Sequence, residues 1–120
     1  MILNLDHHQR LHVISALDLL ENIGRREGFA VCRLQEKLDL TDQEREVVGL
    51  RKLKAENGRV YTLWNNNGQA ALEYDLSEDD VQRITNAIDK YPMVLARDRQ
   101  WWLSLTAQLP ALAESNGDKL

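Results

Sequence analysis

The sequence predicts an α+β fold in which winged-helix-like helices and a three-stranded antiparallel sheet are followed by two C-terminal helices. First, the capping box Thr41-Asp42-Gln43-Glu44 opens a short helix, which Gly49 can end in the left-handed conformation. Second, two strand-like runs flank Asn57-Gly58, the dipeptide that best tolerates positive φ in a hairpin turn. Third, helical signals precede and follow this unit, so the sheet must pack against helices.

The N-terminal part is predicted to form two helices before the short one. Asp6 and Gln9 make a second capping-box pattern, and apolar residues at helical spacing then predict a helix over residues 6–23 that stops near Gly24. Residues 25–28 are expected to be a polar connector, and residues 29–31 either a short extended piece or the start of the next helix. Apolar positions from 31 to 38 then predict a helix that ends near residue 40.

The C-terminal half is predicted to complete the sheet and add two helices. Hairpin strands at 50–54 and 59–64 are followed by an asparagine-rich turn at 65–68 and an alternating strand at 72–76. Ser77 caps a fourth helix whose apolar stripe reaches Tyr91, and a fifth helix is expected over 94–109, stopped by Pro110. This organisation gives one domain over 1–110 and a polar tail over 111–120.

Composition limits the classes of function. A chain of 120 residues can bury a core as one domain, and a net charge of −4 with a pI near 5.3 argues against non-specific binding to nucleic acid or anionic membranes. The single cysteine, Cys32, excludes an intramolecular disulfide and is expected to be a small core residue. The first residues become charged too early for a signal peptide, and no apolar run has membrane-spanning length. We expect a cytoplasmic protein.

The sequence gives no catalytic constellation. His8 and His12 have the spacing of two metal ligands on one helix, but two ligands do not make a site, so we expect two exposed histidines. Asp79 and Asp80 are explained by their position at a helix start. The chain contains no glycine-rich phosphate loop, no Gly-x-Ser-x-Gly elbow and no His-Glu-x-x-His. We therefore predict no enzyme, no cofactor and no metal site.

A winged helix-turn-helix would place residues 41–49 as a recognition helix and the hairpin as a wing. Asp42, Glu44 and Glu46 at the start of that helix would oppose contact with phosphates, which disfavours DNA binding. The hairpin suits nucleic acid better, because four basic residues occur within it: Arg51, Lys52, Lys54 and Arg59. The alternative interpretation is that these charges are solvated and protect a strand edge, and we weigh it more heavily.

A protein partner is favoured by the acidic and aromatic residues of the C-terminal half. Residues 73–80 hold five carboxylates and no base, which suits docking of a charged protein. Trp101 and Trp102 point about 100° apart on a helix, so one of them could anchor an interface, including one between two copies. The predicted interface set is Trp101, Trp102, Leu105, Asp75, Glu78 and Asp79. Burial of both tryptophans between the fifth helix and the sheet is the competing expectation.

The layout resembles a loose group of small uncharacterised proteins encoded in bacteriophage and prophage genomes. The resemblance consists of a leucine-rich helix at 11–20, the Thr-x-x-Glu cap at 41–44, a strand with Trp64, and acidic-start helices from Ser77 onward. Residues 23–28 depart from the compact turn expected in that group. The resemblance implies a mobile-element context, in which small acidic proteins often bind and block host factors. Our leading hypothesis is a non-catalytic protein-interaction module, and a winged-helix DNA-binding regulator is the alternative.

Overall fold

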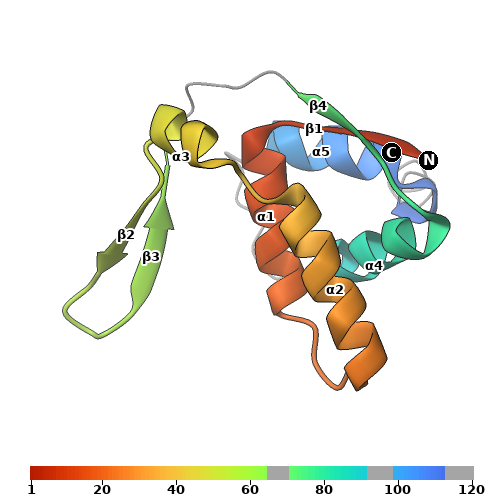
Figure 1. Ribbon diagram of the computed structural model, residues 1–120, viewed down its shortest axis with the longest axis horizontal. Coiled ribbons are helices and arrows are strands. Elements are labelled where there is room, and N and C mark those ends of the chain that lie inside the picture. Colours follow the sequence, from red (N-terminus) through yellow and green to blue (C-terminus); the bar gives the residue numbers. More distant parts are fainter. Residues whose placement is uncertain (65–70, 92–98, 113–120) are drawn as a thin grey trace.

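The computed structural model describes residues 1–64, 71–91 and 99–112 of the chain (Figure 1). Strands and helices alternate irregularly, which confirms the α+β class. In chain order the elements are β1 (Ile2–Leu5), α1 (His7–Asp18), α2 (Arg25–Leu38), α3 (Asp42–Val48), β2 (Arg51–Lys54), β3 (Val60–Leu63), β4 (Leu72–Asp75), α4 (Glu78–Asp89) and α5 (Arg99–Gln108). Among these described elements, no helix is long and apolar enough to cross a membrane.

The sheet differs from the predicted three-stranded arrangement. β2 pairs with β3 as the expected hairpin, but β4 pairs with β1 in a separate antiparallel sheet, with Leu3 opposite Tyr74 and Leu5 opposite Leu72. The predicted single sheet is therefore replaced by two two-stranded sheets, and a winged-helix layout is not confirmed. The physical reason is burial: Leu3 and Leu5 of β1 are fully buried in the core, whereas the hairpin strands offer no buried side chain for a third strand to extend.

The main core lies between the helices and the β1–β4 sheet. α1 contacts α2, α4 and α5 (Figure 1). Its apolar side chains belong to the same buried cluster as theirs. The fully buried members include Leu3, Leu5, Val13, Leu38, Ile84, Ile88, Leu105 and Leu109. A second, smaller cluster is formed by Leu11, Leu40 and Val48, with Leu50 and Trp64 packed against it. This second cluster lies at the base of the hairpin.

The N-terminal helices differ from prediction in their ends. The Asp6–Gln9 capping box is confirmed, with the Gln9 N–H donating to Asp6 Oδ1 at 2.8 Å. α1 ends at Asp18 rather than near residue 23, and Asn22 turns the chain with φ 59°. The predicted polar connector over 25–28 is wrong, because these residues form the first turn of α2. Glu27 in that turn accepts from Arg83 of α4 at 2.5 Å, which joins the two helices.

α3 and the hairpin follow the local sequence signals closely. Thr41 and Glu44 form the predicted capping box, and Gly49 ends α3 with φ 63°. In the hairpin turn only Gly58, with φ 82°, is left-handed, so the predicted turn with positive φ at both central residues is wrong in that detail. The turn is instead closed by the Ala55 N–H donating to the Arg59 carbonyl at 2.8 Å and by Asn57 Oδ1 accepting from the Arg59 N–H at 3.0 Å.

The predicted turn at 65–68, the beginning of the fifth helix and most of the polar tail fall at residues outside the described ranges. The described part of α5 begins at Arg99. α5 ends at Gln108, just before Pro110 as predicted, and residues 110–112 then form a separate helical turn. Leu112 packs against the main core, so at least the first two residues of the predicted tail belong to the folded body.

Candidate interaction surface

The β2–β3 hairpin is attached to the body only at its base. Leu50 and Trp64, which flank the hairpin, pack against the cluster of Leu11, Leu40 and Val48. The Trp64 indole N–H donates to His8 Nδ1 of α1 at 2.7 Å, and the two rings lie edge to face with centroids 5.3 Å apart. Beyond this anchor the hairpin projects away from the helices (Figure 1), and no residue of either strand is buried.

The strand register divides the hairpin into two faces of different chemistry. Residues directly opposite each other in an antiparallel pair share a face. Arg51 opposite Leu63 and Leu53 opposite Tyr61 therefore define an apolar face, which alternation extends to Arg59. Lys52 opposite Thr62 and Lys54 opposite Val60 define the other, basic face. We call the side formed by Arg51, Leu53, Arg59, Tyr61 and Leu63 the apolar face. We call the side formed by Lys52, Lys54, Val60 and Thr62 the basic face.

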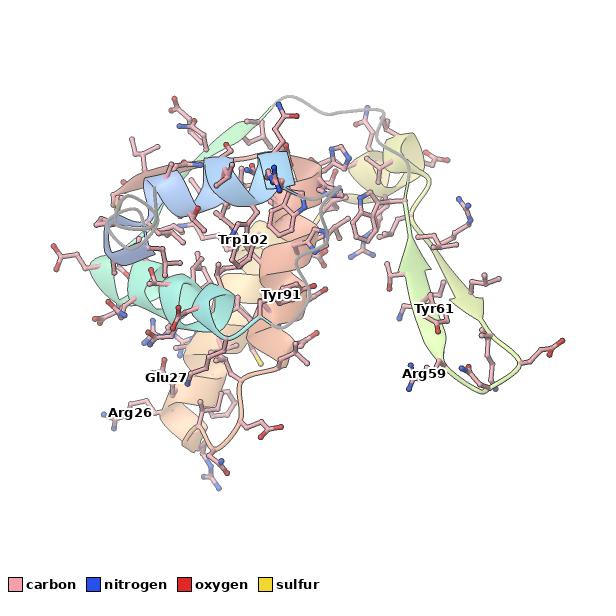
Figure 2. The ribbon with its side chains drawn as sticks, turned by 180° about the vertical axis from the view of Figure 1, so that it is seen from behind. Arg26, Glu27, Arg59, Tyr61, Tyr91 and Trp102 are labelled. Carbon is pink, nitrogen blue, oxygen red and sulfur yellow. The ribbon has the colours of Figure 1, made fainter. Side chains whose placement is uncertain are left out.

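The apolar face is open to solvent. Leu53 is 55% exposed and Tyr61 is 44% exposed, although both are large apolar side chains at the centre of the face. Figure 2 shows Arg59 and Tyr61 along β3, away from Tyr91 and Trp102 on the body. Arg51 is held near the base, where its Nη1 donates to the Gly49 carbonyl at 3.4 Å. The face therefore presents a leucine and a tyrosine between two arginines.

Charge is distributed unevenly between the hairpin and the body. Four basic residues and Glu56 give residues 51–60 a net charge of +3. Because the whole chain carries −4, the other residues together carry −7. On the body, Glu73, Asp75, Glu78 and Asp79 are exposed on β4 and at the start of α4. Asp80 differs from these residues, because Arg83 donates to its carboxylate at 2.7 Å.

The start of α3 is less negative than the sequence suggests. Glu44 points inward, where its carboxylate accepts from the Thr41 N–H at 2.9 Å and pairs with Arg10 of α1. Burial acts to raise the pKa of Glu44, but the hydrogen bonds from Arg10 and Thr41 outweigh it, so the pKa is lowered. Asp42 and Glu46 stay exposed. The expectation of three outward carboxylates is therefore wrong for Glu44 only.

The Arg10–Glu44 pair was not predicted. Arg10 is only 2% exposed, and its Nη1 also donates to the Tyr74 hydroxyl at 2.8 Å and to the Leu38 carbonyl at 3.5 Å. One guanidinium thus joins α1, the end of α2, α3 and β4. The only local signal was an arginine within the apolar stripe of an amphipathic helix, and its partner is 34 residues away.

The histidines of α1 are not exposed as expected. His8 and His12 are half-buried, and His12 stacks on Trp101 with centroids 4.3 Å apart and an interplanar angle of 12°. Tyr91 lies with its hydroxyl 3.2 Å from His12 Nδ1. The described residues hold no group of three or more His, Cys, Asp or Glu that could bind a metal ion. These histidines therefore contribute to an aromatic cluster that packs α1 against α5 and the hairpin base.

The structure places the other predicted interface residues in three environments. Trp101, 7% exposed, and Leu105, fully buried, belong to the core and cannot reach a partner, so the interface expectation is corrected for these two. Trp102 is half-buried against the same core, and Asp75, Glu78 and Asp79 are exposed.

Cys32, expected in the core, is exposed on α2. The hairpin tyrosine and leucine were missed as surface residues, because alternation alone does not show which face is covered.

A cavity of about 340 Å³ lies between α2 and the start of α4. Its charged lining combines Arg33, Lys37 and Arg83 with Asp79 and Asp80. Arg83 is occupied by Glu27 and Asp80, and the hydrogen bond from Arg83 lowers the pKa of Glu27. The lining contains no nucleophile hydrogen-bonded to a base, so the cavity offers no basis for assigning catalysis.

Comparison of the chain with protein-family models, curated proteins and solved structures found no match in any of the three.

Proposed function

We propose that this chain is a small non-catalytic protein-interaction module, of the accessory or inhibitory kind that phages encode, and that its binding element is the apolar face of the β2–β3 hairpin. The observation that carries the proposal is the exposure of Leu53 and Tyr61 on a hairpin that projects from the body. The mobile-element context comes only from the resemblance of the sequence layout.

The composition of the apolar face suits a protein interface. Interface cores are enriched in tyrosine and arginine, and residues of these types carry much of the binding energy of known complexes. Here Tyr61 and Leu53 are flanked by Arg51 and Arg59, which can pair with carboxylates of a partner. Burying one such side chain fully is worth about 1.5–3 kcal/mol, so covering two half-exposed ones would contribute roughly 2 kcal/mol.

The hairpin itself also has a reason to be covered. A two-stranded hairpin that packs on nothing is marginally stable in water. This hairpin has a hydrophobic anchor at its base and none along its strands. A partner surface would supply the missing packing, and the positive charge of the hairpin favours a partner that is acidic around an apolar centre.

Affinity capture with matched variants tests this function. Leu53→Asp and Tyr61→Ser change the apolar face, whereas Phe29→Ser changes a 60% exposed side chain on α2 and serves as the control. We expect the wild-type protein and Phe29→Ser to retain the same proteins from a lysate of the host, and the two hairpin variants to lose them. Equal retention by all four proteins, or no specific retention by the wild type, would contradict the proposal.

Nucleic-acid binding through Arg51, Lys52, Lys54 and Arg59 is a second candidate. The observation that favours it is the inward position of Glu44, which removes one of the carboxylates expected to repel phosphates. Asp42 and Glu46 remain exposed beside the hairpin base, which is why we place it second. A gel shift on random duplex at low salt tests it: binding that weakens with salt, and is lost when the four basic residues are neutralised, would favour this candidate.

A further inference from the structure

We propose that the basic face of the hairpin binds a second copy of this chain, docking on the outer face of its β1–β4 sheet so that two copies form a reciprocal dimer. The inference goes beyond the proposed function, because it uses the opposite face of the hairpin. The apolar face stays available to a different protein partner.

The receiving surface follows from the register of the β1–β4 sheet. Leu3 and Leu5 point into the core, so the alternate residues of β1 face outward. Ile2 lies opposite Asp75 and Asn4 lies opposite Glu73 on that outer face, and all four side chains are exposed. The outer face therefore presents two carboxylates beside an exposed isoleucine.

The basic face of the hairpin and the outer face of the β1–β4 sheet are complementary in charge and in apolar content. The basic face offers Lys52 and Lys54 with the exposed Val60, and the outer face offers Glu73 and Asp75 with Ile2. The Met1 ammonium lies 3.6 Å from Asp75 and moderates its charge, while Glu78 and Asp79 extend the acidic surface onto α4. Opposite potentials of this kind steer association and fix the orientation of the partners.

Within one chain the hairpin does not reach this surface, so the proposed contact joins the hairpin of one copy to the sheet of another. Figure 1 shows the hairpin projecting from the α3 end of the molecule, while β1 and β4 lie over the helices on the other side of α3. One residue on each edge of the β1–β4 sheet already has a side-chain partner: Gln108 of α5 bonds to the backbone of Asn4, and Lys37 of α2 donates to the Asp75 carbonyl. Contact with the outer face, rather than strand addition at an edge, is thus the mode of docking.

Each copy carries both surfaces, so a two-fold dimer makes the same contact twice. The contact consists of a few exposed side chains on each side, and interfaces below about 1,200 Å² in total belong to weak or transient complexes. We therefore expect an equilibrium between monomer and dimer that depends on protein concentration. Because the contact is between exposed charges, raising the salt concentration weakens it.

A charge-swap experiment with sedimentation analysis of the full chain tests this inference. Lys52→Glu with Lys54→Glu reverses the basic face, and Glu73→Lys with Asp75→Lys reverses the outer face. We expect each reversed protein alone to self-associate on the order of 100-fold more weakly than the wild type, because like charges then meet. Mixing the two reversed proteins restores opposite charges at both contacts and should restore the dimer.

Control variants separate charge at the contact from general effects. Arg25→Glu with Arg26→Glu on α2 makes the same change of charge as the reversal of Lys52 and Lys54, and should leave self-association as in the wild type. The milder pairs Lys52→Gln with Lys54→Gln and Glu73→Gln with Asp75→Asn repeat the test if a reversed protein fails to fold, and circular dichroism checks each fold.

A wild-type protein that stays monomeric at every concentration overturns the inference, and so does a mixture of reversed proteins that does not recover the dimer. Neither result affects the proposed function, which depends on Leu53 and Tyr61. Conversely, loss of partner capture by Leu53→Asp leaves self-association intact if the two faces act separately.

Discussion

Replacing Glu44 by alanine should destabilise the protein strongly, because it leaves a buried guanidinium without its counter-charge. Arg10 is 2% exposed and the Glu44 side chain 14% exposed, so little water is available to solvate the unpaired charge. Removing one partner of a buried ion pair costs about 3–5 kcal/mol. Arg10 keeps its hydrogen bonds to Tyr74 and Leu38, which places the expected loss near the lower limit, about 3 kcal/mol.

Urea unfolding at neutral pH measures this loss directly. Thermal melting gives a second readout. For a domain of this size a loss of about 1 kcal/mol lowers the melting temperature by roughly 4 °C, so a loss of about 3 kcal/mol should lower it by about 12 °C. Glu46→Ala is the matched control, because Glu46 is an exposed carboxylate on the same short helix and should change stability by less than about 0.5 kcal/mol. Replacing Arg10 and Glu44 together by leucine should recover much of the loss. If Glu44→Ala and Glu46→Ala had equal stability, the buried-pair account of α3 would be refuted.

Three further predictions follow from local features. The pKa of Glu44 is lowered in the folded protein, so the stability that Glu44 contributes is complete above the unfolded pKa of about 4.3 and is lost as pH falls through the folded pKa. The stability of the wild type should therefore fall more steeply with acid than that of Glu44→Gln. Parallel curves of stability against pH would count against this. Gly58→Ala should lower the free energy of unfolding by about 1 kcal/mol, because the φ angle of Gly58 is 82°. Gly28→Ala in α2 has open space at its Cβ and should raise the free energy of unfolding by about 0.5–1 kcal/mol. Thermal melts that rank the two variants the other way would contradict the turn geometry. Trp64→Phe removes the hydrogen bond to His8 and should cost about 1 kcal/mol, with faster amide hydrogen exchange over residues 51–63; unchanged exchange would show that this bond does not hold the hairpin.

Local sequence signals predicted the parts of the fold that local interactions determine. The capping boxes at Asp6 and Thr41, the left-handed Gly49 and the hairpin around Gly58 each depend on residues within a few positions of one another. The pairing of β4 with β1 joins segments about seventy residues apart, and strand propensity does not identify the partner of a strand. The brief alternation of Leu3 and Leu5 was therefore not recognised as a strand.

The sequence indicated which charged side chains lie on the surface, but not which large apolar side chains do. The basic residues of the hairpin and the exposed Asp75, Glu78 and Asp79 lie on the surface, as charged side chains usually do. Which large apolar residues are exposed depends on the tertiary packing, and here Trp101 is buried while Tyr61 is not. The inward turn of Glu44 could not be read from a capping box, because its partner Arg10 lies on another helix.

Photo-crosslinking from the apolar face tests the central proposal most directly. A benzoylphenylalanine at position 61, in the cells in which the protein normally acts, should crosslink to a discrete protein, and the same group at position 29 should not. Adding Leu53→Asp should abolish the crosslink from position 61. Crosslinks from position 29 alone, or none from position 61 above background, would contradict the assignment of the hairpin as the binding element.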